Sequence, residues 1–325
     1  MSVWPITIGD VRAARDALRS HVTETPLRGY AALDEAVGAG IRVLAKHENF
    51  QPTGAFKVRN GLTALSALAP DERRRGVVAA TRGNHGLGVA WAGQRLGVKV
   101  TVCVPVGNNP EKNAAVRGLG ARLLEEGKDY DESVTAAERL VREEGLHLVH
   151  STNDPAVVAG AGTLTLEMLE ERPDLEALVF SVGGGSQAVG GLIVARALRP
   201  GLPVYAVQAK GASAIHDAWH LGRPVSLPSA DTFADGLATR NTYPLTFGAL
   251  REGLAGFVAV TDAEIAEAVR VLLSTTHSLV EGAGAAGLAA LFKLRDTLAG
   301  KTVGIVLSGA NIDRETLRRV LAGEL

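Results

Sequence analysis

A single lysine stands where a helix is predicted to begin, directly after a tight turn. The turn is Gln51-Pro52-Thr53-Gly54, in which proline and glycine favour a sharp chain reversal, and Lys57 precedes a helix predicted over 58–68. The positive end of the helix dipole disfavours a charged lysine there, and apolar neighbours lower a lysine pKa. A neutral amine is what Schiff-base chemistry requires. Most lysines are solvated surface residues, so Lys57 alone does not indicate a Schiff-base lysine, and the other motifs are needed to distinguish the two roles.

A glycine-rich loop, Gly183-Gly184-Gly185-Ser186, follows a strand predicted over 177–182 and precedes a predicted helix. Consecutive backbone N–H groups at a helix start form an anion cradle, and glycines let a phosphate approach the backbone. The loop also satisfies a loose dinucleotide pattern, which requires an acidic residue at the end of the next strand. Gln208, Ala209 and Lys210 occupy that place. The sequence therefore favours a phosphate outside a dinucleotide, with a plain glycine turn as the alternative.

A third loop, Thr81-Arg82-Gly83-Asn84-His85-Gly86, lies between a strand predicted over 77–80 and a helix predicted over 87–96. A loop and helix start rich in N–H donors suits a carboxylate. His85 taken alone is more often a structural cap than a catalyst. The loop is therefore a candidate for binding the carboxylate of a substrate.

The elements that must position these loops alternate between strand and helix, which predicts α/β domains with open parallel sheets. A small inserted domain is predicted over 76–151, with strands at 77–80, 99–104, 121–124 and 146–150. A large domain is predicted from residues 1–75 and 152–325, with strands at 41–46, 177–182, 204–207 and 302–307. A long polar loop is predicted over 226–241.

Composition excludes several classes of protein. The chain has 325 residues, 46% of them hydrophobic and 21% charged, which is typical of a well-cored globular protein. A net charge of -1, with no basic cluster longer than Arg73-Arg74-Arg75, argues against a nucleic-acid partner. Cys103 is the one cysteine, so a disulfide framework and a cysteine metal cluster are excluded. The chain shows no signal pattern and no apolar stretch of about 18 residues, so we expect a cytoplasmic protein without a membrane partner.

Taken together, the motifs resemble the serine/threonine dehydratase family of fold-type II pyridoxal-phosphate (PLP) enzymes. In that family the lysine motif is typically Gln-Pro-Thr-Gly-Ser-Phe-Lys, and here Ala55 replaces the serine. Ser186 replaces the fourth glycine of the family's phosphate loop. Glu281-Gly282-Ala283-Gly284-Ala285-Ala286 and Ser308-Gly309-Ala310-Asn311-Ile312-Asp313 complete the match. The resemblance implies a tryptophan synthase β-like fold, with the cofactor in the cleft between the two domains.

The resemblance also implies a role for each motif. Lys57 would hold PLP as a Schiff base, with Phe56 packed beside it. Asn84 would hydrogen-bond the pyridoxal 3-hydroxyl, Glu281 would lie near the cofactor rim, and Ser308 would meet the pyridine nitrogen. A neutral serine there moderates the electron sink and suits β-elimination. The phosphate would lie on Gly183, Gly184, Gly185 and Ser186, and the substrate carboxylate on Thr81, Arg82, Gly83, Asn84 and His85.

Arg82 departs from the family pattern. In serine racemases this position is a serine that serves as the second acid/base, on the cofactor face opposite the lysine. Arginine stays protonated and cannot take that proton, so racemisation is disfavoured and elimination favoured. Arg82 could instead grip a second substrate carboxylate, as a hydroxyaspartate would present, or it could point outward to solvent or to an acidic neighbour.

A metal site is a second departure. Many members of the family bind a divalent cation through a Glu and an Asp after the strand that corresponds to 204–207. Gln208 and Ala214 stand in the aligned places here. Because oxygen-seeking cations need carboxylates, the sequence predicts no metal, although nearby Asp217 could compensate.

The sequence thus predicts a PLP-dependent lyase that converts a β-hydroxy-amino acid to a 2-oxoacid and ammonia, with L-threonine or L-serine as the substrate. A dehydratase for an acidic or bulky substrate, such as hydroxyaspartate or phenylserine, is the nearest alternative. An amino-acid racemase and a non-catalytic PLP-binding protein are the less favoured alternatives. By resemblance the protein is a homodimer.

Overall fold

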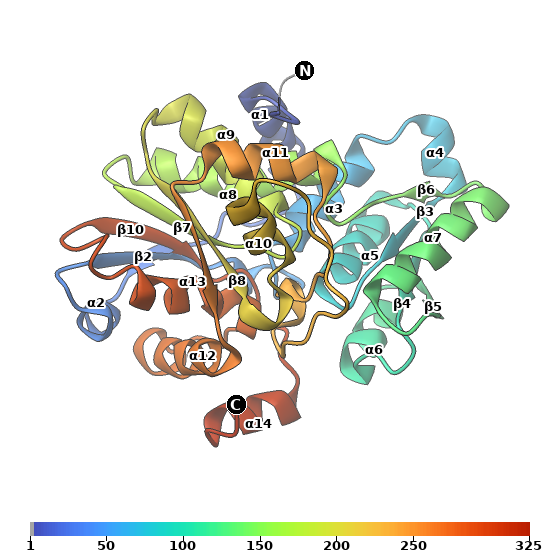
Figure 1. Cartoon of the computed structure of the whole chain (residues 1–325). Helices are drawn as coiled ribbons and strands as arrows, with labels where there is room; N and C mark the ends of the chain where they lie inside the picture. Colours follow the sequence, from blue (N-terminus) through green and yellow to red (C-terminus); the bar gives the residue numbers. More distant parts are fainter. Residues whose placement is uncertain (1–2) are drawn as a thin grey trace.

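A six-stranded sheet forms the centre of the larger part of the molecule (Figure 1). The computed structural model describes residues 3–325. The strands run in the order β1 (Leu27–Gly29), β2 (Arg42–Lys46), β10 (Thr302–Val306), β7 (Ala177–Ser181), β8 (Val204–Ala209) and β9 (Gly256–Val260). All neighbouring strands are parallel except β1, which pairs antiparallel with β2. The α/β class is therefore confirmed, and the larger sheet is mixed.

Helices cover both faces of this sheet and bury its apolar residues in two clusters. One face carries α1 (Ile8–Leu18), α8 (Pro155–Glu171), α9 (Ser186–Leu198) and α11 (Pro244–Gly253). The other face carries α2 (Ala31–Val37), α12 (Asp262–Thr276), α13 (Gly282–Lys293) and, farther out, α14 (Arg314–Leu321). The strands of the middle of the sheet are buried on both sides, which is typical of a parallel α/β sheet.

A four-stranded parallel sheet forms the smaller part of the molecule, at the right in Figure 1. Its order is β5 (Arg122–Glu125), β4 (Val100–Val104), β3 (Val77–Ala80) and β6 (His147–Leu148). The helices between these strands are α5 (Asn84–Leu96), α6 (Pro110–Gly118) and α7 (Tyr130–Glu144). All four strands lie inside the segment 76–151, and the borders of the two domains stay a prediction.

Local sequence signals account for several helix starts. Asn109 accepts hydrogen bonds from the backbone N–H groups of Glu111 and Lys112, and Pro110 follows it as the first residue of α6. The sequence Thr261-Asp262-Ala263-Glu264 predicts a capping box, and Thr261 and Glu264 form it at the start of α12. Cys103 is buried in β4, as its apolar neighbours predict.

Some boundaries differ from the predicted ones. The sequence pattern predicts a first helix over 10–22 and another that begins at 160, whereas α1 covers 8–18 and α8 begins at Pro155. Asp154 caps α8 by accepting from the N–H groups of Ala156 and Val157, so the helix starts five residues earlier than its apolar pattern suggests. The sequence pattern predicts no element at β1, α2, α11, β9 or α14.

The helix that begins with Lys57, α3 (Lys57–Ser66), packs directly against the small sheet's helix α5. A Cβ atom on Gly88 would lie 2.3 Å from the backbone oxygen of Lys57, and one on Gly61 would lie 2.4 Å from the oxygen of Gly88. Both helices therefore touch through their backbones, which only glycine permits. This contact ties the lysine to the loop at the start of α5.

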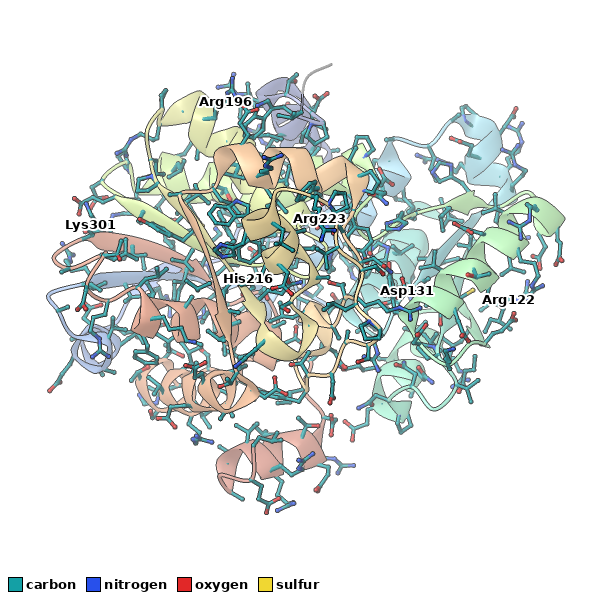
Figure 2. All side chains as sticks on the ribbon, in the orientation of Figure 1. Arg122, Asp131, Arg196, His216, Arg223 and Lys301 are labelled. Atoms are coloured by element: carbon teal, nitrogen blue, oxygen red, sulfur yellow. The ribbon has the colours of Figure 1, made fainter. Side chains whose placement is uncertain are left out.

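A second connection between the two parts runs through the segment between α10 (Ala214–Leu221) and α11. Arg240 and Asn241 of this segment donate hydrogen bonds to Asp131 of α7, which Figure 2 shows at the junction of the two parts. Within residues 3–325, no helix is both long and apolar enough to cross a membrane.

Candidate active site

A cavity opens between the two sheets, and every predicted cofactor-binding and substrate-binding residue lines it. The glycine loop follows β7, the Thr81 loop follows β3 and Ser308 follows β10. Because the carboxyl ends of parallel strands meet at the same edge of a sheet, the loops after β7 and β10 come together, and the loop after β3 of the small sheet lines the same cavity. Lys57 and Glu281 enter the same cavity from the helix start at α3 and from the residue before α13.

Lys57 is the first residue of α3, and its half-buried side chain faces the cavity. Its Nζ atom lies 4.8 Å from the centre of the Phe56 ring, and no hydrogen bond or ion pair holds it within residues 3–325. Burial lowers the pKa of Lys57 to about 8. An amine in this state is available both as a nucleophile towards an aldehyde and as a base.

The turn before Lys57 is fastened to the loop after β10. The Phe56 N–H donates to the Ser308 backbone oxygen at 3.0 Å, and the Ala310 N–H donates to the Gly54 oxygen at 2.8 Å. Gly54 adopts a φ of +69°, which explains the glycine in the motif. The lysine and Ser308 are thereby held at a fixed separation.

The glycine loop is shaped as an anion site at the start of α9. Gly185 has a φ of +101° and precedes the helix without any side-chain cap. A Cβ atom on Gly184 would lie 1.8 Å from Thr152 Oγ1, so glycine is required there. Thr239 and Thr246 donate their hydroxyls to the Gly183 and Gly184 oxygens at 3.1 and 2.8 Å. These bonds occupy the carbonyls and leave the helix start to a ligand.

Two further polar atoms favour an anionic ligand in this part of the cavity. Gln187 Nε2 and Ser181 Oγ are buried, line the cavity and have no hydrogen-bond partner among the described residues. Buried polar atoms without partners are rare, so such atoms indicate a ligand. The residues present therefore fit PLP, with a phosphate at the glycine loop, an unpaired lysine for its aldehyde and the Ser308 hydroxyl for its ring.

Asn84 lies at the centre of a chain of hydrogen bonds. Its Nδ2 atom donates to Glu281 Oε1 at 2.5 Å, and its Oδ1 atom accepts from Asn311 Nδ2 at 2.7 Å. Asn311 also donates to the Thr53 oxygen at 2.8 Å. Burial raises the pKa of Glu281 to about 7, although the Lys112 charge and the Asn84 bond act in the opposite direction. Asn84 is therefore held with one orientation of its amide.

Four further residues that the sequence does not indicate line the cavity. Lys112 Nζ lies 2.5 Å from Asp235 Oδ2, and both residues line the cavity. The Lys112 side chain crosses the backbone at Gly83, where a Cβ atom would lie 3.0 Å from Lys112 Cδ. Tyr130 and Ser151 join the lining with their hydroxyls 2.8 Å apart. In the sequence, Lys112 is marked only by its place after the Asn109 cap, and Asp235 only by its place in the polar loop predicted over 226–241.

In the loop at the start of α5, some side chains form hydrogen bonds within the fold and another lines the cavity without a partner among residues 3–325. His85 Nε2 lies 2.9 Å from the Val149 oxygen, and burial lowers the pKa of His85 to about 3, so the ring is neutral. Thr81 Oγ1 accepts from the Gly83 N–H at 2.8 Å and closes a turn around Arg82. Arg82 is half-buried and lines the cavity.

The place expected for a metal holds an amide. Gln208 is fully buried, and its Oε1 atom accepts from the Ile215 and His216 N–H groups at the start of α10. Ala214 is buried, and the Asp217 carboxylate accepts from Ser213 Oγ at 2.8 Å. Within residues 3–325 no group of three or more His, Cys, Asp or Glu side chains could hold a metal ion.

Known proteins resemble this chain over most of its length. A family profile described as "Pyridoxal-phosphate dependent enzyme" matches residues 18–309. The L-threonine ammonia-lyase of Thermotoga maritima is 38% identical over 316 residues, 97% of this chain and 78% of that protein. The putative threonine dehydratase of Sinorhizobium fredii is 34% identical, over 98% of this chain and 96% of that protein.

Solved structures agree with this comparison. Threonine deaminase isoform 2 from Solanum lycopersicum has a TM-score of 0.91 at 30% identity, over 97% of this chain and 86% of that one. Maize serine racemase has a TM-score of 0.92 at 28% identity, over 99% and 98% of the two chains. The geometry of the cavity and the extent of these matches lead to one conclusion: this chain belongs to the pyridoxal-phosphate-dependent enzyme family.

Proposed function

We propose that this chain is a PLP-dependent carbon–oxygen lyase that converts a β-hydroxy-amino acid to a 2-oxoacid and ammonia. Relatives named L-threonine ammonia-lyase, at 38% identity, make L-threonine and L-serine the first substrates to test. One water leaves the substrate and one enters later, so the net products are the oxoacid and ammonia. The observation that carries the proposal is the unpaired Lys57 amine in one cavity with the glycine loop.

Each motif has a distinct task in this reaction. PLP, when bound, withdraws electrons from the α-carbon of the substrate. Lys57 takes the α-proton onto Nζ, for which a pKa of about 8 is well matched to neutral solution. The N–H groups at the start of α5 bind the substrate carboxylate, and Asn84, oriented by Glu281 and Asn311, fixes the position of the ring.

Elimination is preferred over racemisation in this proposal. Racemisation needs a second group that can exchange a proton with the α-carbon on the face opposite Lys57. Arg82 is permanently protonated, and the neutral His85 ring is turned to the Val149 oxygen. Neither of these two loop residues can exchange that proton, which supports a one-sided reaction with Lys57 as the base.

The visible absorption spectrum of the purified protein tests the proposal. We expect a PLP band that shifts when L-threonine or L-serine is added, together with release of 2-oxobutyrate or pyruvate. Lys57→Ala should abolish oxoacid formation. A PLP band without oxoacid from any hydroxy-amino acid would instead indicate a PLP-binding protein without lyase activity, and conversion between enantiomers would indicate a racemase.

We further propose that the enzyme is a cytoplasmic homodimer. The single cysteine, Cys103, is a buried free thiol, which suits a reducing compartment. Phe50 and Leu279 are exposed large apolar residues near the lysine turn, and Asn49 links them by donating to the Leu279 oxygen at 3.1 Å. Light scattering on a size-exclusion column should give twice the chain mass of 33.8 kDa.

A further inference from the structure

The charged side chains of the cavity are not balanced. Lys57, Arg82 and Lys112 are its basic residues, and Asp235 and Glu281 are its acidic ones. Asp235 pairs with Lys112 at 2.5 Å. Glu281 is held by an uncharged amide, and its pKa of about 7 leaves it only partly ionised. The cavity therefore has an excess of positive charge before any ligand enters.

Arg82 carries this excess as a permanent charge. Its guanidinium forms no ion pair and no hydrogen bond within residues 3–325, and Arg82 is a partly buried residue that lines the cavity. The Thr81–Gly83 hydrogen bond fixes the turn that presents it. Withdrawing a charged group from water is unfavourable without a counter-charge, so a guanidinium in this position favours an anionic ligand.

Three anions could in principle meet Arg82. The PLP phosphate already has the start of α9 with the buried Gln187 amide, and the substrate α-carboxylate has the N–H groups at the start of α5. A third anion would have to belong to the substrate side chain. The planar guanidinium matches a carboxylate with two parallel hydrogen bonds.

We propose that the preferred substrate carries a second carboxylate on its β-carbon and that Arg82 binds this group. The inference rests on the proposed function and narrows it to β-hydroxy dicarboxylic amino acids, in preference to threonine. Arg82 then acts as a specificity-determining residue, since it touches the substrate side chain and takes no part in proton transfer.

Binding of two unreactive acids to the PLP-loaded enzyme tests this directly. Succinate has the four-carbon skeleton of hydroxyaspartate, and butyrate has that of threonine. We expect succinate to bind about 10- to 100-fold more tightly than butyrate, because a charged hydrogen-bonded pair contributes a difference of this order. Arg82→Ala should remove this preference, and Arg82→Lys should keep part of it.

A matched control is Arg122→Ala, which removes an exposed arginine of the same small sheet that does not line the cavity and pairs with Glu144 (Figure 2 labels Arg122). It should leave both affinities unchanged. The proposal is overturned if the wild type does not distinguish the two acids, or if Arg82→Ala weakens both equally, which would place Arg82 on the α-carboxylate. Loss of PLP affinity in Arg82→Ala, with the preference for succinate retained, would assign it to the phosphate and also overturn the proposal.

Turnover separates this inference from the function on which it rests. We expect kcat/KM for 3-hydroxyaspartate to exceed that for L-threonine and to fall about 10- to 100-fold in Arg82→Ala, with threonine turnover little changed. Threonine turnover without a preference for the dicarboxylic substrate would contradict the proposed role of Arg82 and leave the proposed lyase function intact. Tight succinate binding without lyase activity on any hydroxy-amino acid would contradict the proposed lyase function and still support a carboxylate site at Arg82.

Discussion

The lowered pKa of the Lys57 amine leads to a quantitative prediction for its reaction with PLP. An ordinary lysine has a pKa of 10.5, and burial lowers that of Lys57 to about 8. At pH 7 the neutral fraction is then about one in ten, against about one in three thousand for an ordinary lysine. Since only the neutral amine attacks an aldehyde, Lys57 should react with PLP about 300-fold faster at pH 7 than an unperturbed lysine of equal access.

The assay is the rate at which PLP recombines with protein from which it has been removed, followed by absorbance between pH 6 and 10. The rate should rise with pH and level off near pH 8. Nα-acetyl-lysine, measured in parallel, corrects for the ionisation of PLP itself, and Lys57→Ala serves as the blank. A rate that follows the model amine up to pH 10 would refute the assignment of a lowered pKa to Lys57.

Three other perturbations have defined outcomes. Arg59→Met leaves the buried carboxylates of Glu48 and Glu167 without their guanidinium partner, so urea unfolding should show a loss of about 3–5 kcal/mol; a loss below about 1 kcal/mol would contradict a tightly paired cluster. Burial raises the pKa of Glu281 from 4.5 to about 7, so this group reduces stability as pH rises through that window, and Glu281→Gln should remove up to about 3 kcal/mol of the pH dependence of unfolding in the PLP-free protein. Because the Gln208 amide caps α10, EDTA should leave oxoacid release unchanged, and a rate that recovers with Mg²⁺ or Ca²⁺ would disprove this.

Local signals predicted most of the fold because they act within a few residues. The cap at Asn109 and the box at Thr261 appear in the structure as the sequence indicates. The strand Gly256–Val260 was missed because it lies at the sheet edge, where only Phe257 and Val260 are buried and the apolar pattern is weak. The antiparallel β1 has three residues, too few for a periodic pattern.

The site was predictable where one short segment carries one function. The glycine loop and the Lys57 turn are such segments, and the structure brings both into one cavity. The Lys112–Asp235 pair was not predictable, because its partners are 123 residues apart and each looks like an ordinary surface charge. Likewise, the orientation of Asn84 depends on Glu281 and Asn311, whose meeting follows from the packing of the two sheets and not from spacing.

Two kinds of contact hold the small sheet against the large one, and they differ in strength. Behind the cavity, α3 lies in backbone contact with α5 through Gly61 and Gly88, and with α8 through Gly160, where an added Cβ would lie 2.6 Å from the Arg59 oxygen. A contact this close permits little sliding without separation of the helices.

Elsewhere polar contacts join the two parts. Lys112 pairs with Asp235 at the cavity, Arg240 pairs with Asp131, and Asn84 donates to Glu281. Asp235 is partly exposed, so water can replace its partner at a modest cost in free energy. The lysine and the loop at the start of α5 are therefore expected to keep their separation when these polar contacts break. A carboxylate bound at this loop, as proposed above, would lie near the Lys112 side chain and compete with Asp235 for its charge.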